Sequence, residues 1–505
     1  MFCAPQAWSQ TSFLDNGVIR IGVDLARGGA IHYLSESGSS NSVINVYDLG
    51  RYVQQSYYSG PQPYIPPGAT VNPSWIDIGW NPVQAGDSFN FPSQVLNSSN
   101  DGTTLYVKCT PKQWALNNWD SQCTMETWIT LDANRAQVRC RLVNNRSDTT
   151  QYPARGQEQP AIYTVGTLHR LFTYSGAAPF TGEAPTQIIN SGPPWAAWLS
   201  TEHWSALVND QNWGLGVFHA GALAENGGFA GTPGAGGPLN AATGYISPGY
   251  IDILDHDIVY EYEYTLILGD LFNDIRSYAY ANAPNPRPNY VFRQNRRHCY
   301  HANLTDQRPP YTGYWPLTLD QNDPQVVGPW SLWDSADVPR IFIRAAHHTQ
   351  PGQGEVFFAG MDGVFTASKR VAFAIIPDGQ VHTYQVDLSA NALYTGAITR
   401  LRFDPIQVRN PGDSVDLYSI GVIANDCNGN GIDDAVEIIG GGDYDADGDV
   451  DGSDFNGFAG ALAGPGDPPP DTQCAPLLLG AFDGNSDGDI DLPDFAAFQR
   501  AFGGP

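Results

Sequence analysis

Two stretches near the end of the chain carry oxygen-bearing side chains at a spacing that suits a hard metal ion. Residues 443–454 read DYDADGDVDGSD, and residues 483–494 read DGNSDGDIDLPD. In both, acidic or amide residues alternate through the first nine positions, Gly stands at position 6 and a carboxylate at position 12. Alternate oxygen ligands around a sharp glycine turn are the pattern of an EF-hand-type Ca²⁺ loop. The sequence therefore predicts two Ca²⁺ sites.

The predicted ligands are all carboxylates or amides of these two loops: Asp443, Asp445, Asp447, Asp449 and Asp454 in the first, and Asp483, Asn485, Asp487, Asp489 and Asp494 in the second. A third Ca²⁺ loop is possible over residues 426–437, with Asp426, Asn428, Asn430 and Glu437 as ligands. Its position 8 is Asp433, where the other two loops have an aliphatic residue.

An apolar stripe at helical spacing follows each of the two repeated loops: Phe455, Phe458 and Leu462, then Phe495, Phe498 and Phe502. We expect one helix after each loop, with the two stripes packed together. The stretch resembles a type I dockerin, the tandem calcium-loop module of cellulosomal enzymes. The resemblance implies calcium binding and a cohesin-like or cell-surface partner. Loop positions 10 and 11, where dockerins usually carry Ser or Thr, here hold Gly452-Ser453 and Leu492-Pro493.

A second group of polar side chains suits the recognition of sugars. Residues 47–64 (YDLGRYVQQSYYSGPQPY) and 74–87 (SWIDIGWNPVQAGD) combine amides, carboxylates and an arginine with flat aromatic rings. Amides and charged groups give directional hydrogen bonds to hydroxyls, and aromatic rings give contact faces. A polar loop with a tyrosine-rich rim is the alternative interpretation. The expected substrate-binding residues are Arg51, Gln54, Gln55, Tyr58, Trp80, Asn81 and Gln84.

The candidate catalytic residues come from these segments and from residues 155–176. Glycoside hydrolysis requires two carboxylates, one of them an acid with a raised pKa. The candidates are Glu158 with Asp48 or Asp87. β-Elimination on an acidic glycan requires a base and a group that neutralises the uronate carboxyl. The candidates for that chemistry are Tyr57, Tyr58 or His169, with Arg51 and Asn81.

These residues lie in a chain whose patterning is mainly that of β-structure. Strand-like alternation recurs in residues 18–25, 104–109, 123–131, 136–143 and 260–268, and no long helical period interrupts it. We expect a large β-sandwich over 15–290 after a short tail (1–14). It resembles the super-sandwich of galactose-mutarotase-like domains, through the segments GRYVQQSYYSG, WNPVQAGD and QEQPAIY.

Residues 291–424 form a second block of short strands, predicted to be a jelly-roll β-sandwich. It resembles carbohydrate-binding modules, in which Trp315, Trp330 and Trp333 would either stack on a sugar or fill the core. Residues 425–505 complete the chain as the small helical, EF-hand-like calcium module. The expected fold is thus mainly β, with this module at its end.

The net charge, the hydropathy and the cysteines further restrict the partners and the location that we expect for the protein. Of the formal charge of −27, −16 lies in residues 425–505, so nucleic acid is not an expected partner. No apolar run suits a membrane span, and no signal peptide is visible in the first residues. Millimolar calcium sites still favour an extracellular or cell-surface protein. Cys427 and Cys474 could form a disulfide that cross-links the calcium module. Two of Cys109, Cys123 and Cys140 could form another disulfide, or all three could remain buried thiols.

Together these features predict a secreted, modular, carbohydrate-active enzyme that cleaves glycosidic bonds of a polysaccharide. A polysaccharide lyase is the second choice. A non-catalytic glycan-binding, matrix or assembly protein is the third.

Overall fold

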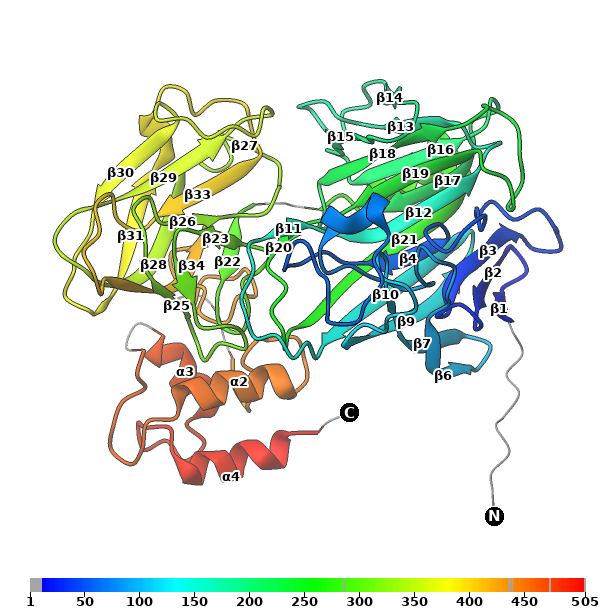
Figure 1. The fold of residues 1–505 in the computed structure, drawn as a ribbon. Helices are drawn as coiled ribbons and strands as arrows, with labels where there is room; N and C mark the ends of the chain where they lie inside the picture. The colour runs from blue at the N-terminus through cyan, green and yellow to red at the C-terminus, as the bar shows by residue number, and fades with distance from the viewer. Residues whose placement is uncertain (1–10, 285–286, 435–436, 438, 472–473, 504–505) are drawn as a thin grey trace, which may run out of the picture. The chain divides into compact units, whose positions relative to one another are not determined.

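The computed structural model describes residues 11–284, 287–434, 437, 439–471 and 474–503, and these form two compact units, 1–285 and 286–505. The fold class expected from the sequence is confirmed: antiparallel β-sheets dominate both units, and small helices occupy the C-terminal end (Figure 1). No helix in the described ranges is long and apolar enough to cross a membrane.

The first unit contains two large sheets. One has ten strands: in path order β1 (Thr11–Asp15), β2 (Ile19–Asp24), β3 (Ala30–Glu36), β4 (Val53–Ser56), β12 (Glu158–Val165), β19 (Thr243–Pro248), β18 (Ala224–Ala230) and β15 (Ala196–Leu199), with β5 (Pro82–Val83) and β8 (Lys112–Gln113) beside β4. We call it the first sheet. Its edge begins four residues earlier than the predicted boundary at residue 15.

The second sheet of this unit has nine strands: β14 (Thr186–Ile188), β13 (Arg170–Thr173), β16 (Trp204–Val208), β17 (Trp213–Phe218), β21 (Val259–Asp270), β10 (Arg135–Asn144), β9 (Cys123–Asp132), β7 (Thr104–Thr110) and β6 (Gln94–Asn100). Short elements complete the unit: β11 (Arg155–Gly156), β20 (Ile251–Asp252), η1 (Pro73–Ile78), η2 (Leu271–Arg276) and α1 (Ser277–Ala281).

Alternating side chains of both sheets make one shared core. Ile19, Ile21 and Val23 of β2 are buried in it together with Met125 and Ile129 of β9. This is the inward face that alternation predicted. Cys109, Cys123 and Cys140 are free thiols buried in the same core, so none of them forms the disulfide considered from sequence.

The second unit begins with a sandwich of two sheets around a separate core. One sheet contains β24 (Thr305–Asp306), β25 (Trp315–Thr318), β34 (Ser414–Gly421), β28 (Arg340–His348), β31 (Val381–Asp387) and β22 (Asn289–Val291). The other contains β23 (Tyr300–Ala302), β26 (Gln325–Val327), β33 (Arg400–Asp404), β29 (Gln353–Ala359) and β30 (Arg370–Ala374). The pair β27 (Trp333–Asp334) and β32 (Ala397–Ile398) and the turn η3 (Leu388–Ala390) lie outside these sheets.

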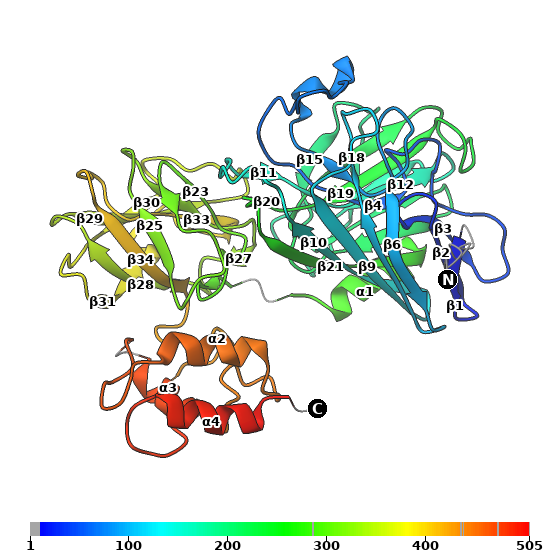
Figure 2. The ribbon, with the colours of Figure 1, turned by 60° about the horizontal axis from the view of Figure 1, so that its bottom comes forward.

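The chain ends in three helices with their own small core: α2 (Gly452–Ala461), α3 (Ala475–Phe482) and α4 (Leu492–Ala501) (Figure 2). The two predicted phenylalanine stripes do pack together, and the rings of Phe458 and Phe498 stack with centroids 5.3 Å apart. Helix α3 was not predicted, because its short apolar sequence has no helical period longer than two turns. The Cys427–Cys474 disulfide that the sequence suggested is present and closes this module.

Candidate functional sites

The two repeated loops adopt the same geometry around the last carboxylate of each. Asp454 is fully buried and its carboxylate accepts hydrogen bonds from the backbone N–H groups of Tyr444 (2.6 Å) and Asp451 (2.8 Å). Asp494 does the same with Gly484 and Asp491, each at 2.9 Å. Each carboxylate therefore bridges the two ends of its loop and caps the N-terminus of the following helix as part of a capping box.

Glycine at loop position 6 permits this closure. Gly448 and Gly488 have φ of 101° and 90°, and each donates its N–H to the first aspartate of its loop, at 3.2 Å and 3.0 Å. Backbone in this region strains any residue with a Cβ. The turn brings carboxylates from distant loop positions together, which a helix or strand of twelve residues would not do.

Each loop gathers carboxylates closely enough to hold one cation. Ligand atoms of Asp443, Asp445 and Asp454 lie within 4.8 Å of one another, as do those of Asp483, Asp487 and Asp494. A second grouping in each loop shares the last carboxylate: Asp449 and Asp451 with Asp454, and Asp489 and Asp491 with Asp494. The acidic clusters that the sequence predicted are thus assembled, and they can bind a metal ion.

Unpaired oxygens indicate where an ion fits. One carboxylate oxygen in each of four loop residues is buried and accepts no hydrogen bond from any described residue: Asp443, Asp445, Asp489 and Asp491. Burial, together with the neighbouring carboxylates, raises the pKa of Asp445 to about 6. A cation among these oxygens would satisfy them and remove the repulsion, whereas buried anions without a partner are costly.

The third possible loop is also folded around its predicted ligands. Asp426 accepts hydrogen bonds from the N–H groups of Gly429 (2.7 Å) and Gly431 (3.1 Å). The amides of Asn428 and Asn430 both reach one oxygen of Glu437, and its other oxygen is buried without a partner among the described residues. Asn428, Asn430 and Glu437 therefore converge while Asp426 closes the loop backbone, although the three-carboxylate groupings of the other loops do not recur here within the described chain.

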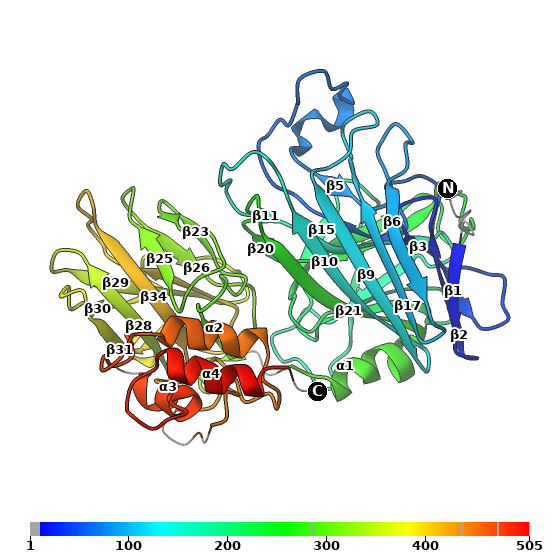
Figure 3. The ribbon, with the colours of Figure 1, turned by 90° about the horizontal axis from the view of Figure 1, so that it is seen from below.

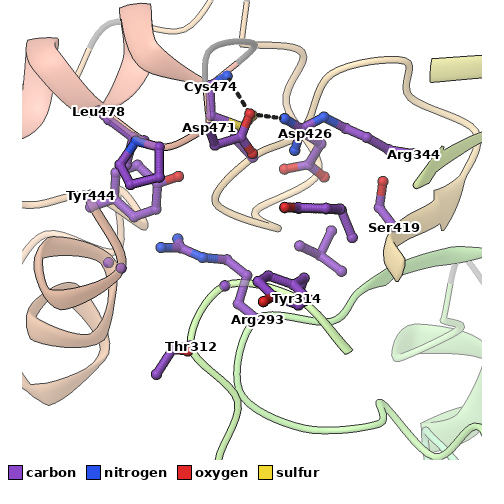
Figure 4. Close-up of a pocket in the computed structure, with 17 residues that line it drawn as sticks. Arg293, Thr312, Tyr314, Arg344, Ser419, Asp426, Tyr444, Asp471, Cys474 and Leu478 are labelled. Carbon is purple, nitrogen blue, oxygen red and sulfur yellow. Dashed lines mark hydrogen bonds and ion pairs between the residues drawn. A yellow bond between two sulfur atoms is a disulfide. The ribbon is translucent and has the colours of Figure 1, made fainter. Parts of the chain in front are cut away.

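Two arginines of the sandwich contact the helical C-terminal module within the second unit. Arg344 pairs with Asp471, and the guanidinium of Arg293 lies 4.2 Å from the ring centroid of Tyr444 (Figure 4). Asn289 donates to Asp426 at 2.7 Å. Arg293, Arg344, Asp426, Tyr444 and Asp471 line a pocket of about 90 Å³ beside the disulfide. The module is therefore held to the sandwich by charge as well as by the chain.

Most predicted sugar-binding side chains lie inside the first unit and hydrogen-bond one another or the backbone. Gln54, Gln55, Trp80, Asn81 and Gln84 are all buried, and so is the candidate catalytic base Tyr57. Gln55 donates to the Glu126 carbonyl and the Thr127 hydroxyl, both at 2.8 Å, and accepts from Tyr57 at 2.9 Å. Gln54 and Gln55 lie in β4, an interior strand of the first sheet. The Gln55 amide reaches β9 across the core, whereas the Gln54 amide donates to the nearby carbonyls of Leu49 and Arg51.

Two predicted catalytic residues also serve local structure. Asp87 is buried, and its carboxylate accepts from the N–H groups of Phe89, Phe91 and Asn118 at 2.9, 2.9 and 2.7 Å. Both of its carboxylate oxygens thus accept hydrogen bonds from backbone N–H groups. The ring of His169 lies in the β12–β13 connection, where Nε2 is 3.4 Å from Asp210. Within the described part of the chain, neither Asp87 nor His169 contacts Glu158.

Glu158, in contrast, lies in a cluster of aromatic rings on the face of the first sheet opposite the core. Tyr245 donates its hydroxyl to the Glu158 carboxylate. Tyr163 and Tyr245 pair across β12 and β19 with ring centroids 4.6 Å apart, and Trp195 lies 5.0 Å beyond Tyr245. Their neighbours Ile162 and Ile246 point the other way, into the core. We call Tyr58, Glu158, Tyr163, Trp195 and Tyr245 the tyrosine–carboxylate cluster.

Electrostatics place Asp48 and Arg51 at this cluster. Burial raises the pKa of Tyr163, the carboxylates of Glu158 and Asp48 raise it further, and the guanidinium of Arg51 lowers it. All three charges therefore act on one phenol. Asp48 is exposed and lies 3.3 Å from Arg51, which also donates to the Ala241 carbonyl at 2.9 Å.

The cluster contains residues that sequence reasoning missed. Tyr245 and Trp195 were not predicted, because they lie far from Glu158 in the chain and reach it only through strand pairing. In the sandwich, Trp315 and Trp333 are buried in the core, and Trp315 donates to Asp306 at 2.7 Å. Those two tryptophans fill the core instead of offering a sugar platform, and Trp330 is covered by Arg400 at 4.5 Å.

Comparison with known proteins returns structural likenesses alone. No protein-family model matches the chain, and no curated protein matches it in sequence. A putative aldose 1-epimerase of Escherichia coli K12 is 10% identical over 51% of this chain and 98% of its own, with a TM-score of 0.32. A galactose mutarotase-like protein of Lactobacillus casei is 10% identical over 51% and 99%, with a TM-score of 0.33.

A third likeness is to the GH36 α-galactosidase of Geobacillus stearothermophilus, 9% identical over 54% of this chain and 41% of that one, with a TM-score of 0.32. Mutarotase-like structures are thus among the neighbours, as the sequence segments of residues 15–290 suggested. Likenesses of this identity and score carry no argument about the reaction of this chain.

Proposed function

We propose that the first unit acts on a carbohydrate at the tyrosine–carboxylate cluster. The observation that carries the proposal is the row of Tyr163, Tyr245 and Trp195, whose neighbouring rings are inclined by 32° and 38°, beside a carboxylate that Tyr245 hydrogen-bonds. Flat, amphipathic rings contact the C–H faces of a sugar, and a carboxylate at their edge accepts from hydroxyls or transfers a proton.

The finer proposal is cleavage of a glycosidic bond, with Glu158 as the proton-transferring group and Asp48 as the second carboxylate. Burial raises the pKa of Tyr58 and of Tyr245, and the nearby Glu158 carboxylate raises both further. These phenols therefore stay protonated near neutral pH and act as donors, which disfavours a tyrosine base for β-elimination. Hydrolysis is the reaction that this arrangement supports best.

Product analysis of the full chain tests this proposal. We would incubate it with neutral and acidic polysaccharides and weigh the released oligosaccharides by mass spectrometry. Products that have gained water support hydrolysis, and Glu158→Gln should then lower kcat/KM by about 10³-fold or more, as for a group acting in general acid–base catalysis. Glu36→Gln, at an exposed glutamate ending β3, is the matched control and should keep full activity.

Other outcomes would redirect the assignment. Unsaturated product ends would identify a lyase and move mutagenesis to Tyr58 and Arg51. Saturable binding with no product would indicate the non-catalytic glycan-binding protein instead.

We further propose that the two repeated loops bind Ca²⁺ and that the third loop is a weaker candidate. The unpaired buried oxygens of Asp443, Asp445, Asp489 and Asp491 support this, because Ca²⁺ prefers oxygen ligands from flexible acidic loops. The Cys427–Cys474 disulfide supports an extracellular or cell-surface location, since disulfides persist in oxidising compartments. A cohesin-like partner and a sugar-binding role of the sandwich stay predictions.

A further inference from the structure

We propose a second glycan-binding groove, on the outer face of the nine-stranded sheet. We call it the outer groove; it is a pocket of about 390 Å³ whose polar and aromatic lining residues include Trp128, Gln137, Arg139, Phe218, Glu263 and Tyr278. These residues come from β9, β10, β17, β21 and α1 (Figure 3). The tyrosine–carboxylate cluster belongs to the other sheet, so the two sites are separate.

The outer groove lies beside a row of charges that neutralise one another. Arg141 and Glu126 are directly opposite across β10 and β9 and form an ion pair at 3.3 Å. Lys108 pairs with the other oxygen of Glu126 at 2.9 Å, and Arg141 also pairs with Glu261. This row has no charge left over for a ligand.

The next row, two residues along each strand, leaves its charges available. Arg139 and Glu263 are directly opposite across β10 and β21, yet no ion pair joins them in the described structure. The guanidinium of Arg139 instead lies 4.4 Å from the ring centroid of Trp128, and its buried Nε has no hydrogen-bond partner among the described residues. The guanidinium N–H donors of Arg139 and the carboxylate of Glu263 therefore face one pocket. The indole ring of Trp128 holds the guanidinium in place.

Aromatic side chains close the far side of the outer groove. Phe218 and Tyr278 meet edge to face with centroids 5.5 Å apart, and Leu271, Ile275 and Ala279 of η2 and α1 pack behind them. Thr265, paired with Phe218 across β21 and β17, adds a hydroxyl to the floor. The pocket thus combines a rigid apolar wall with donors and acceptors on the opposite side.

This chemistry suits a neutral sugar unit of an oligosaccharide. Arg139 donates to hydroxyl oxygens, Glu263 accepts from hydroxyl protons, and Gln137 does both, while Phe218 and Tyr278 contact C–H faces. The opposite charges of Arg139 and Glu263 balance, so the pocket does not require a charged ligand. The choice of carbohydrate rests on the function proposed above, and the groove would hold a polysaccharide chain away from the reacting bond.

Affinity gel electrophoresis of the full chain tests the proposal. A Glu158→Gln background prevents turnover, and the gels contain xylan, glucomannan, mixed-linkage β-glucan or pullulan, with polygalacturonate as the acidic arm. We expect at least one neutral polysaccharide to retard the protein. Arg139→Met and Glu263→Gln should each weaken that retardation about tenfold, since each removes a polar contact to the sugar. Lys108→Met, in the ion-paired row and outside the groove lining, is the matched control and should be retarded as the parent is.

Three results would overturn the outer groove. They are retardation unchanged in both Arg139→Met and Glu263→Gln, no retardation by any neutral polysaccharide, and retardation by polygalacturonate alone. Glu263→Gln alters an exposed side chain, so thermal unfolding of that variant separates lost binding from lost folding. In the active background, Arg139→Met should retain the rate on short oligosaccharides. Loss of turnover in Glu158→Gln alone tests the proposed catalytic site independently of the groove.

Discussion

Residues 47–87 and residues 443–494 are both rich in polar side chains, but they form opposite kinds of interior. In the first stretch, Gln55, Asn81 and Asp87 are buried, and their side chains hydrogen-bond neighbouring groups. In the second, Asp443 and Asp445 bury oxygens that no described residue satisfies. We call the first stretch closed in hydrogen bonding, although the Trp80 Nε1 is buried without a partner among the described residues, and we call the second open.

A high density of polar side chains therefore does not by itself indicate a binding site. A buried amide whose partners are all present stabilises the fold and has nothing left to offer a ligand. Several buried carboxylates that lack partners and lie within 4.8 Å of one another instead favour a cation. Where an unpaired carboxylate stands alone, the expected response is uptake of a proton.

The largest test of this comparison is removal of calcium. Chelation should unfold residues 425–505 and leave the first unit folded, because binding to the native loops is linked to folding of the module. At free Ca²⁺ a thousand times Kd, each site contributes about 4 kcal/mol. The thermal midpoint of this module should therefore fall by about 15 °C or more. Scanning calorimetry with circular dichroism at 222 nm measures this, since α2, α3 and α4 carry most of the described α-helix.

The control for chelation is re-addition of Ca²⁺ against Mg²⁺ at equal concentration. Full recovery with Ca²⁺ and little with Mg²⁺ is expected from flexible loops rich in carboxylates. A module midpoint that does not move on chelation would contradict the metal assignment of both loops.

The next largest effect should come from a lone unpaired carboxylate in the first unit. Glu225 is buried between the sheets, and both oxygens lack hydrogen-bond geometry to any described residue. Burial raises the pKa of Glu225 to about 7, which the Ser205, Ser200 and Trp198 side chains offset only in part. The folded state then holds a proton that the unfolded chain releases near pH 4.5. Stability should therefore fall as pH rises from about 4.5 to 7.

Substitution of Glu225 by Gln should remove this pH dependence. The variant should be more stable than the parent at pH 8 by about 3 kcal/mol, from 1.4 kcal/mol per pKa unit, and similar to it at pH 4. Urea unfolding across pH 4–8 measures both slopes. Parallel curves for parent and variant would show that Glu225 is ionised at little cost, and the comparison between lone and clustered carboxylates would then fail.

Within the open stretch, loss of the last carboxylate of a loop should weaken cation binding more than loss of an exposed carboxylate. Asp454 belongs to both carboxylate groupings of its loop, so Asp454→Asn removes a charge from each. We expect the affinity of this loop to fall about 100-fold and the titrated stoichiometry to drop from two ions towards one, as after loss of a ligating group. Isothermal titration measures it. Asp467→Asn, exposed between the loops, is the control, and two unchanged sites in Asp454→Asn would remove Asp454 from the ligand set.

The same contrast explains what the sequence could predict. The two acidic loops were recognisable because every candidate ligand lies within twelve consecutive residues, so local spacing encodes the geometry. The hydrogen bonds of Gln55 could not be predicted in this way, since its acceptor Glu126 is 71 residues away. Tyr245 is likewise 87 residues from Glu158. Strands were predicted well by alternation, whereas β4 was not, because its amides take the place of apolar side chains.

The smallest effect should come from a substitution in the closed stretch, residues 47–87. This substitution tests whether these residues serve the fold alone. Gln55→Ala removes the acceptor of the Tyr57 hydroxyl and the side-chain donor to the Glu126 carbonyl, and leaves the Thr127 hydroxyl only the longer bond from Gln84 at 3.4 Å. The free energy of unfolding should fall by about 2 kcal/mol, the usual cost of buried groups left unpaired. Gln94→Ala, exposed at the start of edge strand β6, should change it by less than about 0.5 kcal/mol. Calcium stoichiometry and kcat/KM should be unchanged in both variants. A selective loss of kcat/KM in Gln55→Ala, at unaltered stability, would instead return residues 47–87 to the substrate site.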